Sequence, residues 1–188
     1  AGWTACVVRL VPHRRAAILS AWLFVFVTHC GNWSGEWLVG GMESKVFAYG
    51  LIFLGWAALW DGRWRTVAVC AGVAIALHPV VGGWAVLATL GALLLVTLRG
   101  DRPWPGWPVL VESILIVIAL SMPGLLPVLR IVLAPIDAET RYAANYLQVF
   151  YRLSHHLDPM VFPLRAHLGY AVLIGLWLLG LRSGRSTP

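Results

Sequence analysis

Long apolar runs alternate with short polar breaks along this chain, and the breaks hold nearly all of the charged residues. This alternation is typical of a chain that crosses a bilayer several times, because a helix satisfies its own backbone polar groups inside hydrocarbon. We therefore predict an all-α fold, a polytopic transmembrane helix bundle of about six spans: 16–28, 46–60, 66–77, 84–98, 109–133 and 164–181.

The longest uncharged run, residues 66–98, is too long for a single crossing. Its 33 residues would form a helix of about 50 Å, whereas a hydrocarbon core is about 30 Å thick. The pair His78–Pro79 falls near its middle, with two glycines shortly after, and proline disfavours helix in the residue before it. We predict a helical hairpin here, with one span before His78, a turn, and a second span from Trp84.

Two local patterns add detail to this bundle. Small residues recur at every fourth position at Ala68, Gly72 and Ala76, which predicts a helix face that another backbone approaches closely. The longest polar stretch, residues 135–163, carries aromatic residues spaced by about four. These are typical of an amphipathic external helix lying on the membrane surface: Tyr142, Tyr146, Phe150 and Tyr151.

Charge assigns the two sides of the predicted membrane. The larger basic set lies on one side: Arg9, Arg14, Arg15, Arg63, Arg65, Arg99, Arg102, Arg182 and Arg185. The other side receives five basic residues at most, and it receives most of the acidic ones: Glu36, Glu43, Asp137, Glu139 and Asp158. Because basic residues concentrate in cytoplasmic loops, we expect the arginine-rich loops in the cytoplasm and the acidic and histidine-containing loops outside the cell membrane.

Composition supports a membrane domain and excludes several other classes. Hydrophobic residues make up 60% of the chain, charged residues 12%, and the mean hydropathy is +0.78, whereas soluble domains carry about 25% charged residues. The net charge of +6 does not indicate nucleic-acid binding, because the single lysine leaves no basic tail. The three cysteines lack CxxC spacing, so they predict neither a metal site nor a disulfide framework. We expect residues 1–188 to be one transmembrane domain, a piece of a longer membrane protein.

The first candidate site is the segment Gly40–Tyr49 on the predicted external side. Glu43 and Lys45 sit where the second span enters the membrane, and paired glycines precede them. A carboxylate at that depth is suited to general-base catalysis or to holding a divalent cation. The alternative is an interfacial ion pair that anchors the helix. Glu36, beside two tryptophans, is a second acidic candidate, with an interfacial role as its alternative.

The second candidate is the external segment Arg152–Pro159. Adjacent His155 and His156, with Asp158 two residues on, are possible metal ligands, and the histidines are also possible hydrogen-bond donors to a phosphate. Both histidines could bind one ion only on a non-helical backbone. The alternative is a polar loop whose histidines bond to the backbone. Guanidinium groups match phosphate oxygens, which makes Arg152 and Arg141 candidate phosphate ligands.

A third candidate is His78, at the predicted break in an apolar hairpin. An ionisable residue within a membrane domain is a functional-site hypothesis by default, and the alternative is a cap on the broken helix. Glu112 is instead expected to have a structural role, paired with Arg99 or Arg102. No nucleotide-binding loop, GxSxG elbow, HExxH helix or kinase signature occurs, so we expect any chemistry to act on a lipid-linked or extracytoplasmic substrate.

The segments GGMESKVFAYG, HPVVGGW and RLSHHLDP, within residues 32–163, resemble the layout of the GT-C superfamily of polyprenyl-phosphate-sugar glycosyltransferases. They also resemble bacterial inner-membrane proteins of no assigned function. The GT-C resemblance implies sugar transfer from a polyprenyl-phosphate donor to an extracytoplasmic acceptor. It also implies that an acidic residue of the first external loop, Glu36 or Glu43, is the catalytic base or metal contact. Lys45, Arg141 and Arg152 would then neutralise the lipid phosphate, and three histidines would line the site: His78, His155 and His156.

Two other function classes fit the same pattern. Prolines at His78–Pro79 and at Pro123 and Pro127 predict bent or interrupted spans, which are typical of a transporter or channel. Ionisable residues are nearly absent from the spans, however, and pumps usually need them. The third class is a non-catalytic structural subunit, in which the polar residues serve only stability.

Overall fold

Helices dominate the part of the chain that the structure describes. The computed structural model describes residues 2–11, 13–31, 43–100 and 104–183, and none of these residues lies in a β-strand. The predicted all-α fold is therefore confirmed for these residues. They belong to two compact units: a first unit, Ala1–Val25 with Leu38–Ala134, and a second unit, Phe26–Trp37 with Pro135–Pro188.

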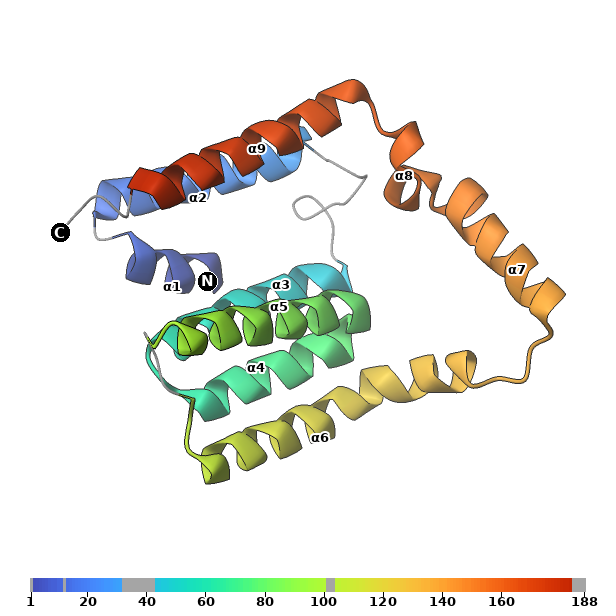
Figure 1. Cartoon of the computed structure of the whole chain (residues 1–188), viewed down its shortest axis with the longest axis horizontal. Helices are drawn as coiled ribbons and strands as arrows, with labels where there is room; N and C mark the ends of the chain where they lie inside the picture. Colours follow the sequence, from blue (N-terminus) through green and yellow to red (C-terminus); the bar gives the residue numbers. More distant parts are fainter. Residues whose placement is uncertain (1, 12, 32–42, 101–103, 184–188) are drawn as a thin grey trace. The chain divides into compact units, whose positions relative to one another are not determined.

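The first unit is built around helix α4. Its neighbours α3 and α5 run opposite to α4, and α6 runs in the same direction (Figure 1). Helix α1 packs against α3 on the far side of the unit from α6. The helices are α1 (Gly2–Leu10), α2 (Arg14–Gly31, shared between the units), α3 (Ser44–Trp60), α4 (Trp64–Leu77), α5 (Pro79–Leu98) and α6 (Trp107–Val132).

A glycine turn reverses the chain between α3 and α4. Gly62 adopts a left-handed conformation with φ of +73°, which residues with a side chain rarely adopt. Its N–H donates to the Leu59 carbonyl at 3.0 Å, and the Arg63 N–H donates to the Ala58 carbonyl at 2.8 Å. These two bonds form a Schellman motif, which satisfies the last carbonyls of α3 and ends it sharply.

The predicted break at His78–Pro79 is confirmed. His78 is extended (φ −150°, ψ 90°) between α4 and α5, and Pro79 occupies the first turn of α5, where its missing N–H costs no helical bond. The turn is tighter than we predicted, because α5 begins at Pro79 and not at Trp84. The paired glycines thus lie inside α5 and not in a loop.

Helix α6 continues through both of its prolines, so of the two outcomes expected at Pro123 and Pro127, a bend or an interruption, the interruption is wrong. Each proline removes one backbone donor but leaves the neighbouring bonds of a 26-residue helix in place. Gly124 holds this part of α6 against α4, because a Cβ added to it would lie 2.5 Å from the Ala76 carbonyl oxygen. That packing stabilises the helical path.

Small residues form the interior of the first unit, and large apolar residues cover its outside. Ala48, Ala58 and Ala74 have no exposed surface, whereas Trp84 is 70% exposed and Leu98 is 74% exposed. Gly72 is buried against α6, where an added Cβ would lie 2.8 Å from the Leu120 Cβ. The predicted small-residue face of α4 is therefore a helix contact surface.

Two helices among the described residues are long and apolar enough to cross a membrane by themselves: α5 and α6. The prediction of about six spans is therefore not supported by the lengths of the described helices. Helices α3 and α4 are apolar but have only 17 and 14 residues, about 26 Å and 21 Å of helix. The apolar part of α9 is likewise short, Leu164–Leu176.

The second unit contains α9 and a chain of short helices. Asp137 caps α7, because its carboxylate accepts hydrogen bonds from the Thr140 N–H at 2.8 Å and the Thr140 hydroxyl at 2.7 Å. The aromatic residues spaced along α7 and the following π-turn contact one another, with Tyr146 5.0 Å from Phe150 between ring centroids. The elements are α7 (Ala138–Tyr146), η2 (Leu147–Arg152), α8 (Ser154–Leu157), η3 (Pro159–Val161) and α9 (Leu164–Ser183).

The two adjacent glycines of α5 provide a matched test of this packing. A Cβ on Gly82 would lie 2.5 Å from the Ile75 backbone nitrogen, whereas a Cβ on Gly83 would meet nothing within 4 Å. Gly82→Ala should therefore lower the free energy of unfolding in detergent by about 1–3 kcal/mol, and Gly83→Ala should raise it by about 0.5–1 kcal/mol. Circular dichroism during titration with a denaturing detergent measures both, and equal effects would contradict the close α4–α5 approach.

Candidate functional site

The polar residues of the first unit gather at the two ends of its helices. Because α3 and α4 are antiparallel, the start of α3 and the break at His78 lie at one end, which we call the Glu43 end. The α3–α4 turn and the start of α6 lie at the opposite end, which we call the arginine end. The charge pattern of the sequence assigned two sets of residues to opposite sides of a membrane. Within the first unit, the helix directions place these two sets at opposite ends.

Glu43 and Lys45 form an ion pair at the Glu43 end. Lys45 Nζ lies 2.9 Å from Glu43 Oε2, the Lys45 side chain is 9% exposed and the Glu43 side chain is 51% exposed. Glu43 occupies the N-cap position of α3, but its side chain makes no capping bond. The pair therefore presents a carboxylate to the surroundings and keeps an ammonium group buried behind it.

His78 caps α5 at the same end. Its Nδ1 accepts a hydrogen bond from the Val81 N–H at 3.2 Å, which requires an imidazole with no proton on Nδ1. The cap, one of the two roles expected for His78, therefore occurs. The bond engages one ring nitrogen, and Nε2 is the nitrogen through which His78 could donate a hydrogen bond to a substrate.

The remaining sequence-derived candidates belong to the second unit or lie outside the described residues. Glu36 lies outside the described residues. His155 and His156 belong to α8, whose backbone is helical and not the non-helical backbone that binding of one ion by both would require. Asp158 Oδ1 accepts the Met160 N–H at 2.9 Å, so this carboxylate caps η3. Arg141 and Arg152 are exposed on α7 and η2 of the second unit.

No metal centre forms among the residues that the structure describes. In this part of the chain, no group of three or more histidine, cysteine, aspartate or glutamate side chains could hold an ion. Of the residues predicted as possible metal ligands, Glu43 belongs to the first unit, and His155 and Asp158 belong to the second unit. Among the described residues, the Glu43 end offers one carboxylate, already paired with an ammonium group, which is a poor ligand set for a divalent cation.

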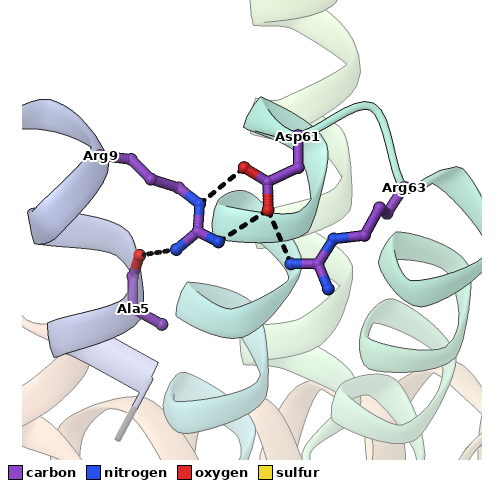
Figure 2. Close-up of polar contacts among 4 residues, drawn as sticks. All are labelled: Ala5, Arg9, Asp61 and Arg63. Carbon is purple, nitrogen blue, oxygen red and sulfur yellow. Dashed lines mark hydrogen bonds and ion pairs between the residues drawn. The ribbon is translucent and has the colours of Figure 1, made fainter.

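Asp61 organises the arginine end (Figure 2). Arg9 Nε and Nη2 donate to Asp61 Oδ1 and Oδ2 at 2.8 Å and 2.7 Å, and Arg63 Nη2 donates to Oδ2 at 2.8 Å. Arg9 also donates to the Ala5 carbonyl within α1. The hydrogen bond from Arg9 lowers the pKa of Asp61 most. The positive charges of Arg9 and Arg63 and the hydrogen bond from Arg63 lower this pKa further, to about 2. This cluster joins the end of α1 to the end of α3.

A second ion pair joins α4 to α6 at the arginine end. Arg65 Nε lies 2.8 Å from Glu112 Oε1. The structural role expected for Glu112 agrees with this contact, but its observed partner is Arg65 and not Arg99, and Arg102 lies outside the described residues. Nearness in sequence favoured Arg99 and Arg102, whereas the packing of α4 against α6 brings Arg65 to Glu112. The Arg9–Asp61 pair was not predicted, because the two residues are 52 positions apart in the sequence and no local pattern connects them.

Comparisons with known proteins identify no relatives: no family model, no curated protein and no solved structure matches this chain.

The lowered pKa of Asp61 predicts a pH-dependent stability. The folded state binds the Asp61 proton more weakly than the unfolded chain, whose carboxyl titrates near 3.8. The cluster therefore contributes its full stabilisation above pH 4 and loses it as the pH falls towards 2. Asp61→Asn should lower the free energy of unfolding at pH 7, and the difference from the wild type should shrink between pH 4 and pH 2. A difference that is constant over this range would contradict the ionised cluster.

Proposed function

We propose that the first unit is embedded in a lipid bilayer as part of a multi-pass membrane protein. The observation that carries this proposal is its inverted packing: the buried residues are mostly alanine and glycine, and most of the large apolar side chains are exposed, with Val7, Ile52 and Ile75 as the buried exceptions. A soluble protein gains stability by burying its large apolar side chains, whereas membrane helices associate through small residues and turn large ones towards the lipid.

The distribution of charge supports the same proposal. Helix α5 has 20 residues, about 30 Å of helix, and none of them is charged. The ion pairs Arg9–Asp61 and Arg65–Glu112 lie at one end of the unit, and Glu43–Lys45 lies at the other. The two polar ends are separated by α3, about 26 Å of helix, which is close to the thickness of a bilayer core, about 30 Å. The positive-inside rule then assigns the arginine end to the cytoplasm.

Labelling of single cysteines tests both the insertion and the orientation. Ser44 and Thr66 are exposed residues of the first turns of α3 and α4, at opposite ends of the unit. Both variants are made in a chain whose native cysteines are replaced by alanine. When an impermeant maleimide is applied to bacterial cells with a permeabilised outer membrane and an intact inner membrane, Ser44→Cys should react. Thr66→Cys should react only after the membrane is disrupted.

The same two variants provide the contradicting outcome. Equal labelling of both positions in intact membranes would rule out a bilayer between the two ends. Release of the chain from membranes by alkaline carbonate would rule out integral insertion altogether. Either result would leave the exposed apolar helices to be explained by contact with another protein.

Glycosyl transfer at the Glu43 end is the more specific function that we propose for such a protein. The support is the exposed carboxylate of Glu43 beside the buried ammonium of Lys45, at the same end as His78. In this reaction Glu43 would take the proton of an acceptor hydroxyl. The acceptor oxygen would form a bond to the anomeric carbon, and the bond from that carbon to the polyprenyl phosphate would break with its electron pair on the phosphate. Lys45 would offset the charge of the departing phosphate.

The expected effect of removing this base is large. General-base catalysis contributes about 10²–10⁴-fold to a rate, so Glu43→Gln should slow release of polyprenyl phosphate from a polyprenyl-phosphate hexose in proteoliposomes by at least about 100-fold. Glu139→Gln, an exposed carboxylate of α7, is the matched control and should leave the rate unchanged. An unchanged rate in Glu43→Gln would exclude the assigned base. Solute uptake without release of polyprenyl phosphate by the wild type would favour transport.

A further inference from the structure

An apolar groove runs along the first unit between α5 and α6. Its space amounts to about 220 Å³, and apolar side chains and glycines form nearly all of its surface. Residues of α4 lie along it with residues of the two helices on either side, among them Val67, Ala71, Leu93, Val117 and Ile118. Trp64 and Trp104 lie along it towards the arginine end.

The lining of the groove favours an alkyl chain as its occupant, because apolar side chains and glycines form nearly all of its surface. The groove lies among helices whose large apolar residues face outwards, so a bilayer around the unit would bring acyl chains directly to it.

A polar hollow adjoins this groove at the arginine end. Trp64 lines both, and Arg63, Arg65 and Glu112 line the hollow. The Arg65 side chain is 77% exposed and that of Arg63 is 55% exposed, so both guanidinium groups remain accessible although each is ion-paired. Arginine guanidinium groups form two-pronged hydrogen bonds with phosphate oxygens.

The hydroxyl of Ser113 gives a second, independent observation. Ser113 lines the apolar groove, and among the described residues its buried Oγ has no hydrogen-bond partner. A buried polar atom without a partner costs free energy, which a ligand carrying an acceptor would recover. Ser113 follows Glu112, the partner of Arg65, so it lies beside the polar hollow and at the start of the groove.

We propose that this groove and hollow together bind one anionic phospholipid. Its acyl chain lies in the groove, an ester carbonyl accepts from the Ser113 hydroxyl, and its phosphate lies at Arg63 and Arg65. Arg99, at the C-terminus of α5 and thus at the same end of the unit, adds to the positive field around the headgroup. The proposal depends on the membrane insertion of the first unit, and it is independent of glycosyl transfer.

Photo-crosslinking in vesicles of defined composition tests the site. The full chain is inserted in phosphatidylcholine vesicles that contain one-fifth phosphatidylglycerol, with an alkyl diazirine on an acyl chain of one lipid or the other. We expect phosphatidylglycerol to label residues of the groove on α4 and α5 at least about fivefold more than phosphatidylcholine does. Arg65→Gln should reduce this preference at least twofold, and Arg65→Lys should retain part of it. Arg130→Gln, which removes the same charge near the far end of α6, should leave it unchanged.

A variant that fills the groove separates lipid binding from loss of folding. Ala71→Phe should abolish groove labelling by occupying the space of the acyl chain, whereas Ala119→Phe, on an exposed position of α6, should not. Circular dichroism of each variant establishes that it is folded. Equal labelling by the two lipids, or labelling spread along all exposed leucines, would overturn the lipid site while leaving insertion intact. Crosslinks between two copies of the chain at the groove would assign it to a second protomer. Failure of the chain to insert would overturn both proposals.

Discussion

The close approach of helix backbones around α4 is the constraint on which the rest of the first unit depends. Gly72 and Gly124 bring α4 and α6 together, and Gly82 brings α5 against Ile75 of α4. Helices that contact one another through small residues are stabilised by dispersion between their closely spaced backbones, and they gain little from the hydrophobic effect. The large apolar side chains are consequently left outside, where a bilayer is the solvent that suits them.

This packing also determines where the polar residues can lie. The closely packed interior consists mostly of small residues and leaves little room for charged groups. The ion pairs accordingly occur at the ends of the helices: at the start of α3, where α1 meets α3, and where α4 meets α6. Asp61 connects Arg9 of α1 to Arg63 of the α3–α4 turn, and Arg65 pairs with Glu112 across the α4–α6 contact. These pairs hold the ends of helices whose middle sections contact one another through small residues.

The break at His78 illustrates why sequence reasoning succeeded for the fold and less well for sites. Proline at the start of a helix and a capping side chain before it are local properties, so the hairpin was predictable from neighbouring residues. The start of α5 at Pro79, five residues before the predicted start at Trp84, was not predictable, because paired glycines suggest a turn as readily as a helix contact. Only the nearness of Ile75 distinguishes the two roles. The continuity of α6 through two prolines likewise depends on its contact with α4.

By itself, the sequence determined the helical fold, the hairpin, the small-residue face of α4 and the separation of charges between helix ends, because each follows from local composition and periodicity. Tertiary structure alone decided which arginine pairs with which carboxylate, and that Glu43 is held beside a buried Lys45. It also decided that Asp158 caps a turn, and that a groove opens between α5 and α6. Those features depend on contacts between residues distant in sequence, or on the exact backbone path, which neither spacing nor residue type specifies.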